Sequence, residues 1–380
     1  MATEPAPDPA PLRAARRQRA FAAMEAHDLD VLVLGRVANM RYVSGVPLLW
    51  NAGSRPFGPG CIAVRATREV YLLSTWDEGV PEEIPHDHLY GITWNPMNQV
   101  AMLQGIAAQV GPARVGTDAM SPLFARLLPL AFPDADLVDA TPALREARRI
   151  KTAEEVAAIR AAIGVADSAL AVAVAELRPG LSERELTGVF MDAMASRGVT
   201  TPSNQDVVRI TTAGSARPGT DRRIQDGDLV AFDAGVVADG YAGEVGRTWP
   251  VGTGAQEAGV AELARRWDQL WARLLEACQP GAPAAGLFEA YRAAGEPVPA
   301  VPVGRGLGLG FDDPVIAAGL PATAARERLD PGVVLVVTGC VTDERVGSMV
   351  AHEPVLITRD GPELLSLSPF WNPAPVGATT

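Results

Sequence analysis

The spacing of hydrophobic and polar residues divides the chain into two parts. In the first part, amphipathic helical stretches such as 13–27 alternate with short apolar runs such as 30–34. Two β-rich runs, 60–65 and 70–74, are joined by a short polar segment, which predicts a β-hairpin. An alternation of helices and strands predicts an α/β domain for this part.

The second part begins with two strong helix signals. Thr152 with Glu155, and Ser182 with Glu185, form capping boxes in front of apolar residues at helical spacing. A third helix is expected over 256–278. The strand-like runs among these helices are 229–232, 241–251, 333–337 and 355–357. This mixture predicts an α+β domain.

These patterns give a domain plan. We expect a tail at 1–12, an α/β domain at 13–140, a linker at 141–151, an α+β domain at 152–370 and a tail at 371–380.

The charge of the chain limits its partners. The formal net charge is −12, and the acidic residues are spread out rather than gathered in a tail. Nucleic acids and anionic membranes require clustered basic residues, so neither is expected as the main partner. No run of eighteen apolar residues is found, and the first twenty residues lack the apolar middle of a signal peptide. We therefore expect a cytoplasmic protein that does not span a membrane.

Cysteine and lysine usage excludes further chemistry. Cys61, Cys278 and Cys340 are far apart and form neither a disulfide framework nor a Cys-x-x-Cys metal pair. Lys151 is the only lysine, and it lies in a charged segment. Pyridoxal phosphate needs a buried Schiff-base lysine, so we exclude that chemistry and expect no cofactor.

Two motifs in the second part carry a family resemblance. Residues 228–235 read DLVAFDAG, and residues 240–251 read GYAGEVGRTWPV. They resemble the M24 peptidase family, which includes Xaa-Pro aminopeptidases, prolidases, methionine aminopeptidases and creatinase. Further landmarks follow in family order at 39–45, 149–155, 304–314, 330–332 and 355–365. The likeness covers about residues 13–370 and implies a creatinase-like α/β domain followed by an α+β pita-bread domain.

The resemblance also shows where this chain departs from the family. Metal-dependent members hold two divalent cations with two Asp, one His and two Glu. The first Asp is kept as Asp233, the second falls on Glu244, and the metal-binding His falls on Arg305. The first Glu falls near Thr338, and the last falls on His352, or on Glu353 if the alignment slips by one residue.

The two further histidines that serve catalysis in the family are also missing. The downstream one falls on Asp312, and the upstream one falls within 215–219, where the sequence has no histidine.

The charges of the matched residues support a site without a metal. A guanidinium has no lone pair to give to a metal, so Arg305 cannot act as a ligand. With Asp233 and Glu244 it instead gives a nearly neutral set of side chains without any cation. We therefore expect no metal, and this set argues against a dinuclear metallopeptidase.

The candidate residues each have a functional and a structural interpretation. The catalytic candidates are Asp233, Glu244 and His352, and the substrate-binding candidates are Arg305, Asp312, Trp249, Thr338 and Tyr241. The two acids could transfer protons, or could form a structural ion pair with the guanidinium. His352 could be an acid or base, or a core residue, Trp249 could line a pocket or only pack, and Asp312 could cap the turn at Pro314.

Two weaker motifs are set aside. The glycine-rich run 304–310 precedes no clear helix, so we interpret it as a close backbone approach rather than a dinucleotide loop. His86 and His88 follow Pro85 and are assigned to a solvated loop rather than a metal site.

Three functional hypotheses follow. The first is a metal-independent enzyme that uses acid–base side chains on a small molecule in hydrolysis, elimination, isomerisation or cyclisation. Arg305 would anchor the substrate, Glu244 or Asp233 would be the base, and His352 the partner acid. Creatinase, in the same family, works on a C–N bond in this way, although it relies on a histidine that is missing here.

The second hypothesis is a non-catalytic binding protein, and the third is a metal-dependent Xaa-Pro dipeptidase, which the lost ligands contradict. The resemblance further implies a homodimer.

Overall fold

The chain folds as two units, residues Met1–Arg148 and Arg149–Thr380. The computed structural model describes residues 10–46, 60–91, 93, 95–118, 121–204, 206–212, 221–253 and 257–371. The unit boundary falls inside the segment 141–151 that the sequence predicts as a linker, and most of that segment is a helix, α5 (Thr141–Arg149).

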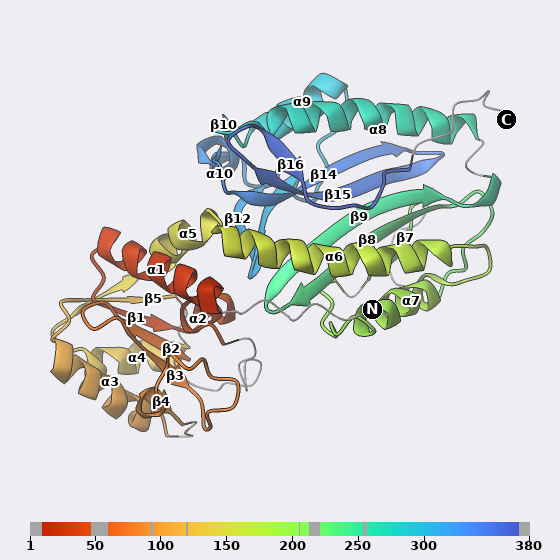
Figure 1. Ribbon diagram of the computed structural model, residues 1–380. Coiled ribbons are helices and arrows are strands. Elements are labelled where there is room, and N and C mark those ends of the chain that lie inside the picture. Colours follow the sequence, from red (N-terminus) through yellow and green to blue (C-terminus); the bar gives the residue numbers. More distant parts are fainter. Residues whose placement is uncertain are drawn as a thin grey trace. The chain divides into compact units, whose positions relative to one another are not determined.

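The first unit is built on a sheet with the strand order β4-β3-β2-β1-β5-β6. Its strands are β1 (Val31–Leu34), β2 (Cys61–Val64), β3 (Glu69–Leu73), β4 (Leu89–Tyr90), β5 (Arg114–Thr117) and β6 (Asp136–Asp139). Its helices before α5 are α1 (Ala10–Ala26), α2 (Val37–Ser44), α3 (Pro96–Val110) and α4 (Pro122–Ala131), with a 3₁₀ turn, η1, at His86–His88. Helices α1 and α2 lie on one side of the sheet, and α3 and α4 on the other (Figure 1). The predicted hairpin is confirmed by the antiparallel pairing of β2 with β3.

The second unit is built on a larger sheet with the order β12-β11-β14-β15-β9-β8-β7, to which β16 adds beside β15. Its strands are β7 (Val208–Ile210), β8 (Leu229–Ala238), β9 (Tyr241–Pro250), β11 (Gly304–Gly308), β12 (Gly310–Ile316), β14 (Val334–Asp343), β15 (Gly347–Ile357) and β16 (Pro362–Leu364). A separate small sheet pairs β10 (Ala282–Pro283) with β13 (Arg328–Leu329).

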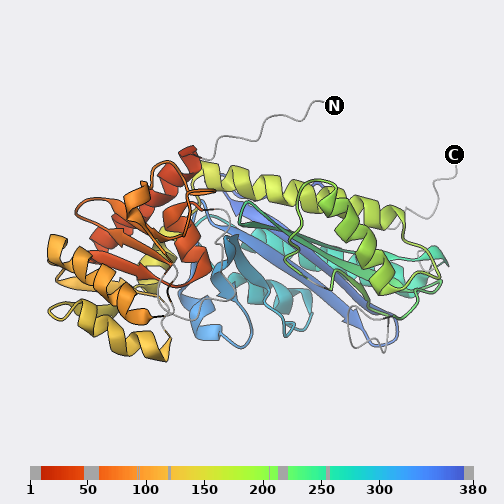
Figure 2. The same cartoon turned by 90° about the horizontal axis from the view of Figure 1, so that it is seen from below.

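Helices cover one face of this sheet. They are α6 (Ala153–Ala175), α7 (Glu183–Ala195), α8 (Ala258–Ala277) and α9 (Gly286–Ala294), while the short helix α10 (Pro321–Arg326) lies next to β12 and β10. Helix α6 runs along β8 and β9, and α8 runs along β14 and β15 (Figures 1 and 2). Both predicted capping boxes are present, at the starts of α6 and α7. The α+β architecture expected for the second part is therefore confirmed.

Successive side chains of each strand point to opposite faces of the sheet. The odd-numbered residues of β14 and β15, such as Leu335 and Ala351, pack under α8 in one buried apolar cluster. On β9, a Cβ on Gly243 would lie 2.4 Å from the Ile163 nitrogen of α6, so the odd-numbered residues of this strand also face a helix. The even-numbered residues of β9, β14 and β15 face the other side of the sheet, where the cavities described below lie.

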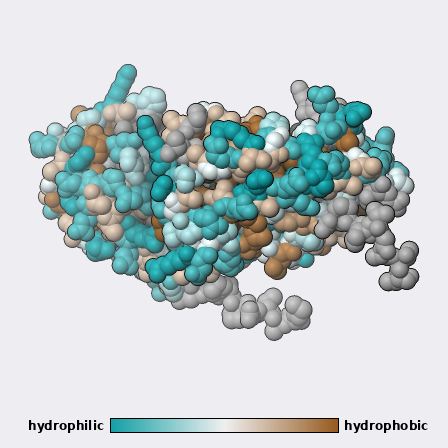
Figure 3. All heavy atoms as spheres, turned by 90° about the horizontal axis from the view of Figure 1, so that it is seen from above, coloured by the Kyte–Doolittle hydropathy of each residue, from teal (hydrophilic) through white to brown (hydrophobic). Residues whose placement is uncertain are grey.

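Helix α6 is also long and apolar enough to cross a membrane, by length and composition alone. It packs on β8 and β9, however, and a buried core helix passes the same test. The outer surface drawn in Figure 3 is largely hydrophilic, with small groups of hydrophobic residues.

Candidate active site

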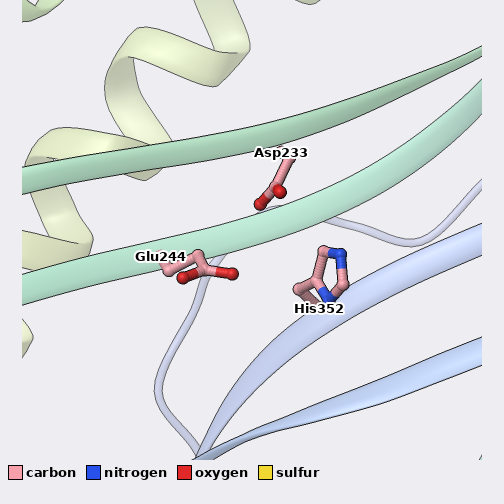
Figure 4. Close-up of side chains that lie close together, drawn as sticks. All are labelled: Asp233, Glu244 and His352. Carbon is pink, nitrogen blue, oxygen red and sulfur yellow. The ribbon is translucent and has the colours of Figure 1, made fainter. Parts of the chain in front are cut away.

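Three predicted site residues converge on the sheet face away from the helices. Asp233 lies on β8, Glu244 on β9 and His352 on β15, and one ligand atom from each lies within 4.8 Å of the other two (Figure 4). The strand register explains this proximity, because Gly246 of β9 pairs with Asp233 on one side and with His352 on the other. Residues far apart in the sequence thus form one cluster.

Gly246 is the backbone position that allows the cluster to form. A Cβ at this position would lie 2.5 Å from the Cδ2 atom of His352, closer than real Cβ contacts. A side chain at 246 would therefore displace the imidazole. The glycine creates the space that the histidine ring occupies.

The one-residue alternative in the alignment is resolved by the sheet. Glu353 points to the helix-facing side, where its carboxylate accepts a hydrogen bond from Arg247 Nη2 at 2.6 Å. His352 points to the cavity side. Since neighbouring residues of a strand face opposite ways, only His352 can join Asp233 and Glu244.

Arg305 occupies the position next to the two acids. It lies on β11, and its Nη2 donates a hydrogen bond to Glu244 Oε1, a residue that is fully buried. Burial lowers the pKa of Arg305, while the nearby negative charge of Asp233 raises it. The expected ion pair of Arg305 with Glu244 is therefore present, and the charge of Asp233 acts on the same guanidinium.

Thr338 orients the histidine ring. Thr338 and His352 pair across β14 and β15, and Thr338 Oγ1 lies 2.9 Å from His352 Nδ1. Nε2 of His352 makes no hydrogen bond to the residues that the structure describes.

Burial lowers the pKa of His352. The negative charge of Asp233 opposes this, and the positive charges of Arg305, Arg209 and Arg247 lower the pKa further. The ring is therefore neutral at pH 7.

The two acids keep unused hydrogen-bonding capacity. Asp233 Oδ1 and Glu244 Oε2 are buried and accept no hydrogen bond from the described part of the chain. Next to them are two cavities of about 340 and 460 Å³, both lined by Asp233, His352, Val350 and Arg209. A buried carboxylate oxygen without a donor is costly, so this arrangement favours a ligand or water with hydrogen-bond donors.

Arg209 is a site residue that the sequence reasoning missed. It lies in the middle of β7 and pairs with Ala231, two residues before Asp233 on the same face of β8. The available signal was a single arginine between two β-branched residues, Val208 and Ile210. This three-residue strand is too short to be recognised by its pattern alone.

Two of the substrate-binding candidates lie on the helix-facing side of the β8–β9 hairpin. Tyr241 is buried and donates a hydrogen bond to Glu155 Oε1 of α6 at 3.1 Å. Trp249 packs edge-on against Phe232, with ring centroids 5.6 Å apart. The expectation that these two residues contact substrate beside Asp233 is thus corrected, because both have the opposite parity to Glu244 on an unbroken hairpin.

Asp312 has a structural partner. Its Oδ2 accepts a hydrogen bond from Lys151 Nζ at 2.9 Å, and the lysine side chain is completely buried. The only lysine of the chain therefore holds the start of α6 to β12. The segment 215–219, in which the upstream histidine was sought, lies outside the described residues.

The weaker motifs behave as expected. Residues 304–308 form strand β11, and the chain turns at Leu309 into β12, with no helix directly after them. His86 is exposed and bonds to Asp77, whereas His88 stacks on Tyr71, so the two histidines do not share a site.

The donor set does not fit two divalent ions. Of the five positions that the family resemblance implies as ligands, only Asp233, Glu244 and His352 carry metal-binding side chains. The fourth holds Arg305, which already pairs with Glu244, and the fifth holds the uncharged Thr338. A metal at the three remaining donors would lie beside the guanidinium of Arg305, whose positive charge opposes the binding of a second cation.

Comparison with known proteins gives consistent results over both units. The model of "Metallopeptidase family M24" matches residues 157–359, and that of the "Creatinase/Prolidase N-terminal domain" matches residues 16–150. An uncharacterized peptidase of Staphylococcus aureus (strain MW2) is 26% identical over 247 residues, which are 62% of this chain and 66% of that protein. The Xaa-Pro aminopeptidase of Escherichia coli (strain K12) is 34% identical over 119 residues, 31% of this chain and 27% of that protein.

Solved structures show the same fold. The Xaa-Pro dipeptidase from Bacillus anthracis is 18% identical to this chain with a TM-score of 0.78. The alignment covers 95% of this chain and 99% of the dipeptidase chain. The prolidase from Pyrococcus horikoshii OT3 is 19% identical with a TM-score of 0.75. The alignment covers 93% of this chain and 99% of the prolidase chain.

Proposed function

We propose that this chain, which belongs to metallopeptidase family M24, is an enzyme that moves protons on a small molecule without a metal ion. The observation that carries the proposal is the ion pair between Arg305 and Glu244 beside Asp233 and His352. A fixed guanidinium compensates the carboxylates, as a bound cation would.

The side chains support acid–base chemistry. Neutral His352, held at Nδ1 by Thr338, can accept a proton at Nε2. The negative charge of Asp233 stabilises the imidazolium that forms, since it raises the pKa of His352. The electron pair of the broken X–H bond stays on the substrate or, in hydrolysis, on the oxygen of the attacking water, and the proton returns to another atom of the substrate or to its leaving group. This transfer is common to hydrolysis, elimination, isomerisation and cyclisation.

The names of the relatives favour a peptidase instead. The solved neighbours include an Xaa-Pro dipeptidase and a prolidase. Against this, the chain has lost donors at the positions that the resemblance implies as metal ligands. The two functions differ in a measurable requirement, which is stoichiometric divalent metal.

Metal content tests the proposal. The chain is purified, incubated with Mn²⁺, dialysed and measured by inductively coupled plasma mass spectrometry. We expect no stoichiometric metal in the wild type and metal uptake in Arg305→His, which supplies a nitrogen donor and releases Glu244. Arg273→His, on the exposed side of α8, is the matched control. Stoichiometric Mn²⁺ in the wild type, with cleavage of Ala-Pro, would establish the metal-dependent dipeptidase.

Catalysis is tested separately. A small-molecule extract is incubated with the wild type in the presence of EDTA, and the change in each compound is followed by mass spectrometry. A compound consumed by the wild type and by Glu276→Gln, an exposed-carboxylate control, should persist with Asp233→Asn and with His352→Gln. If the wild type changes no compound, the non-catalytic binding protein replaces the enzyme.

A further inference from the structure

Arg209 places a positive charge in the cavities. Its backbone pairs with Ala231, on the face of β8 that carries Asp233, and its side chain lines both cavities. The residue is exposed, unlike the buried residues Val208 and Ile210 on either side of it. The side chain therefore lies at the solvent-accessible wall of the candidate active site.

The charge of Arg209 is uncompensated in the described part of the chain. Its guanidinium makes no ion pair or hydrogen bond with any described residue, whereas Arg305 is paired with Glu244. The charge does act inside the site, since it lowers the pKa of both His352 and Cys340. Of the two arginines that line the larger cavity, Arg209 is thus the one without a carboxylate partner among the described residues.

We propose that Arg209 anchors the substrate, and that the substrate is a small organic carboxylate with an apolar body. The inference rests on the proposed function. From the sequence we expected Arg305 to anchor the substrate, and we now assign this role to Arg209. The guanidinium fork matches the two oxygens of a carboxylate and can bind it bidentately.

The charge balance favours a monoanion. Beside the larger cavity, Asp233 and Glu244 offset Arg209 and Arg305, whereas the smaller cavity is also lined by the exposed Asp206. A carboxylate adds one negative charge. A phosphate dianion would add two charges beside two carboxylates and be repelled more strongly.

The wall of the larger cavity favours an apolar body. The loop Pro299–Pro302 and the side chain of Val350 line it on the apolar side, while Arg209 and Asp233 line it on the charged side. A volume of about 460 Å³ suits a small molecule rather than a folded partner. The cavity therefore offers one anionic subsite and one apolar subsite.

Isothermal titration calorimetry tests the proposal with a matched pair of probes. 4-Methylpentanoate carries the anion and an apolar body, and 4-methylpentanamide is its neutral counterpart. A charge-assisted bond contributes about 1.5–3 kcal/mol, so we expect the carboxylate to bind roughly 10- to 100-fold more tightly than the amide. Arg209→Gln should remove this preference, and Arg209→Lys should restore part of it.

The controls separate a lost anchor from lost folding or lost catalysis. Arg273→Gln, an exposed arginine on α8, should keep the preference, and every variant should unfold at the wild-type temperature. Equilibrium binding needs no turnover, so this result is independent of the metal and activity tests above. Equal affinity for acid and amide in the wild type, tighter binding of inorganic phosphate, or unchanged affinity in Arg209→Gln would each overturn the proposal.

Discussion

Two pairs of an arginine with a buried glutamate lie on opposite faces of the same sheet, and they differ in how many of their hydrogen-bonding atoms have partners. On the helix-facing side, Arg247 Nη2 donates to Glu353 at 2.6 Å and to Ser366 Oγ at 2.7 Å, and both charged side chains are 1% exposed. The guanidinium also lies 4.0 Å from the centre of the Phe370 ring. On the cavity side, Arg305 pairs with Glu244, but Glu244 Oε2 and Asp233 Oδ1 accept no hydrogen bond from the described residues.

The difference separates a structural ion pair from one available for chemistry. Glu353 uses both oxygens, because Ser366 also donates to Oε1 from its backbone nitrogen and to Oε2 from its hydroxyl. Nothing on that side is left for a ligand, and no cavity adjoins it among those described. On the cavity side, Glu244 Oε2 and Asp233 Oδ1 are spare acceptors, Arg305 lines one cavity, and Asp233 lines both. The ion-pair chemistry is the same on both faces, so unused hydrogen-bonding capacity is the more informative sign of function.

The largest effect is expected from Arg247→Met. The substitution leaves the Glu353 carboxylate buried without its cation, and breaking a buried pair in this way costs about 3–5 kcal/mol. Urea denaturation followed by circular dichroism should show this loss in the free energy of unfolding. Because Arg247 also donates to the backbone oxygen of His352, the active-site strand would be disturbed as well.

A double variant checks the cause of that loss. Arg247→Met combined with Glu353→Leu removes both charges, so most of the lost stability should return. If the double variant is no more stable than Arg247→Met, the unpaired carboxylate is not the source of the destabilisation.

Local sequence signals predicted the capped helices and the central strands of the second unit, whereas β7, β11 and β12 were not predicted. The capping boxes at Thr152 and Ser182 place the starts of α6 and α7 because they depend only on neighbouring residues. The segment 141–151 was less predictable, since charged residues suit both a linker and an amphipathic helix such as α5. The family motifs supplied the order in which the strands carry Asp233, Glu244 and His352.

The faces of the strands were harder to predict. Tyr241 and Trp249 are near Glu244 in sequence, yet they point toward the helices because strand neighbours alternate between faces. Arg209 joins the site only through the pairing of β7 with β8, a long-range contact with no local signature. Sequence motifs therefore identified the strands of the site, while strand pairing decided which side chains meet.

A smaller effect is expected from Arg305→Met. The substitution also removes a cation from a buried glutamate, but Arg305 lines a cavity that water can enter, so the loss should be about 1–3 kcal/mol. The measurement is the same urea titration as for Arg247→Met. A loss as large as that of Arg247→Met would mean that the two pairs are equally structural, and would remove the contrast between the two faces.

The smallest effect is the pH dependence that His352 contributes to stability. Its pKa in the folded protein is lowered, mainly by burial and also by Arg305, Arg209 and Arg247, although Asp233 raises it. Below pH 6.5 the unfolded chain therefore binds a proton that the folded chain does not, so stability is highest above pH 6.5 and falls as the pH decreases toward the folded pKa. The slope is at most about 1.4 kcal/mol per pH unit.

The contribution of His352 is isolated by subtraction, because other groups titrate in the same range. The free energy of unfolding is measured between pH 5 and pH 8 for the wild type and for His352→Gln, and the difference between them should shrink as the pH falls below about 6.5. His86→Gln, at an exposed histidine in the first unit, serves as the control: the hydrogen bond to Asp77 raises the pKa of His86, so the difference should change in the opposite direction. A constant difference for His352→Gln would mean that the ring is equally basic in both states, and the neutral proton acceptor beside the Arg305–Glu244 pair would be lost from the proposed mechanism.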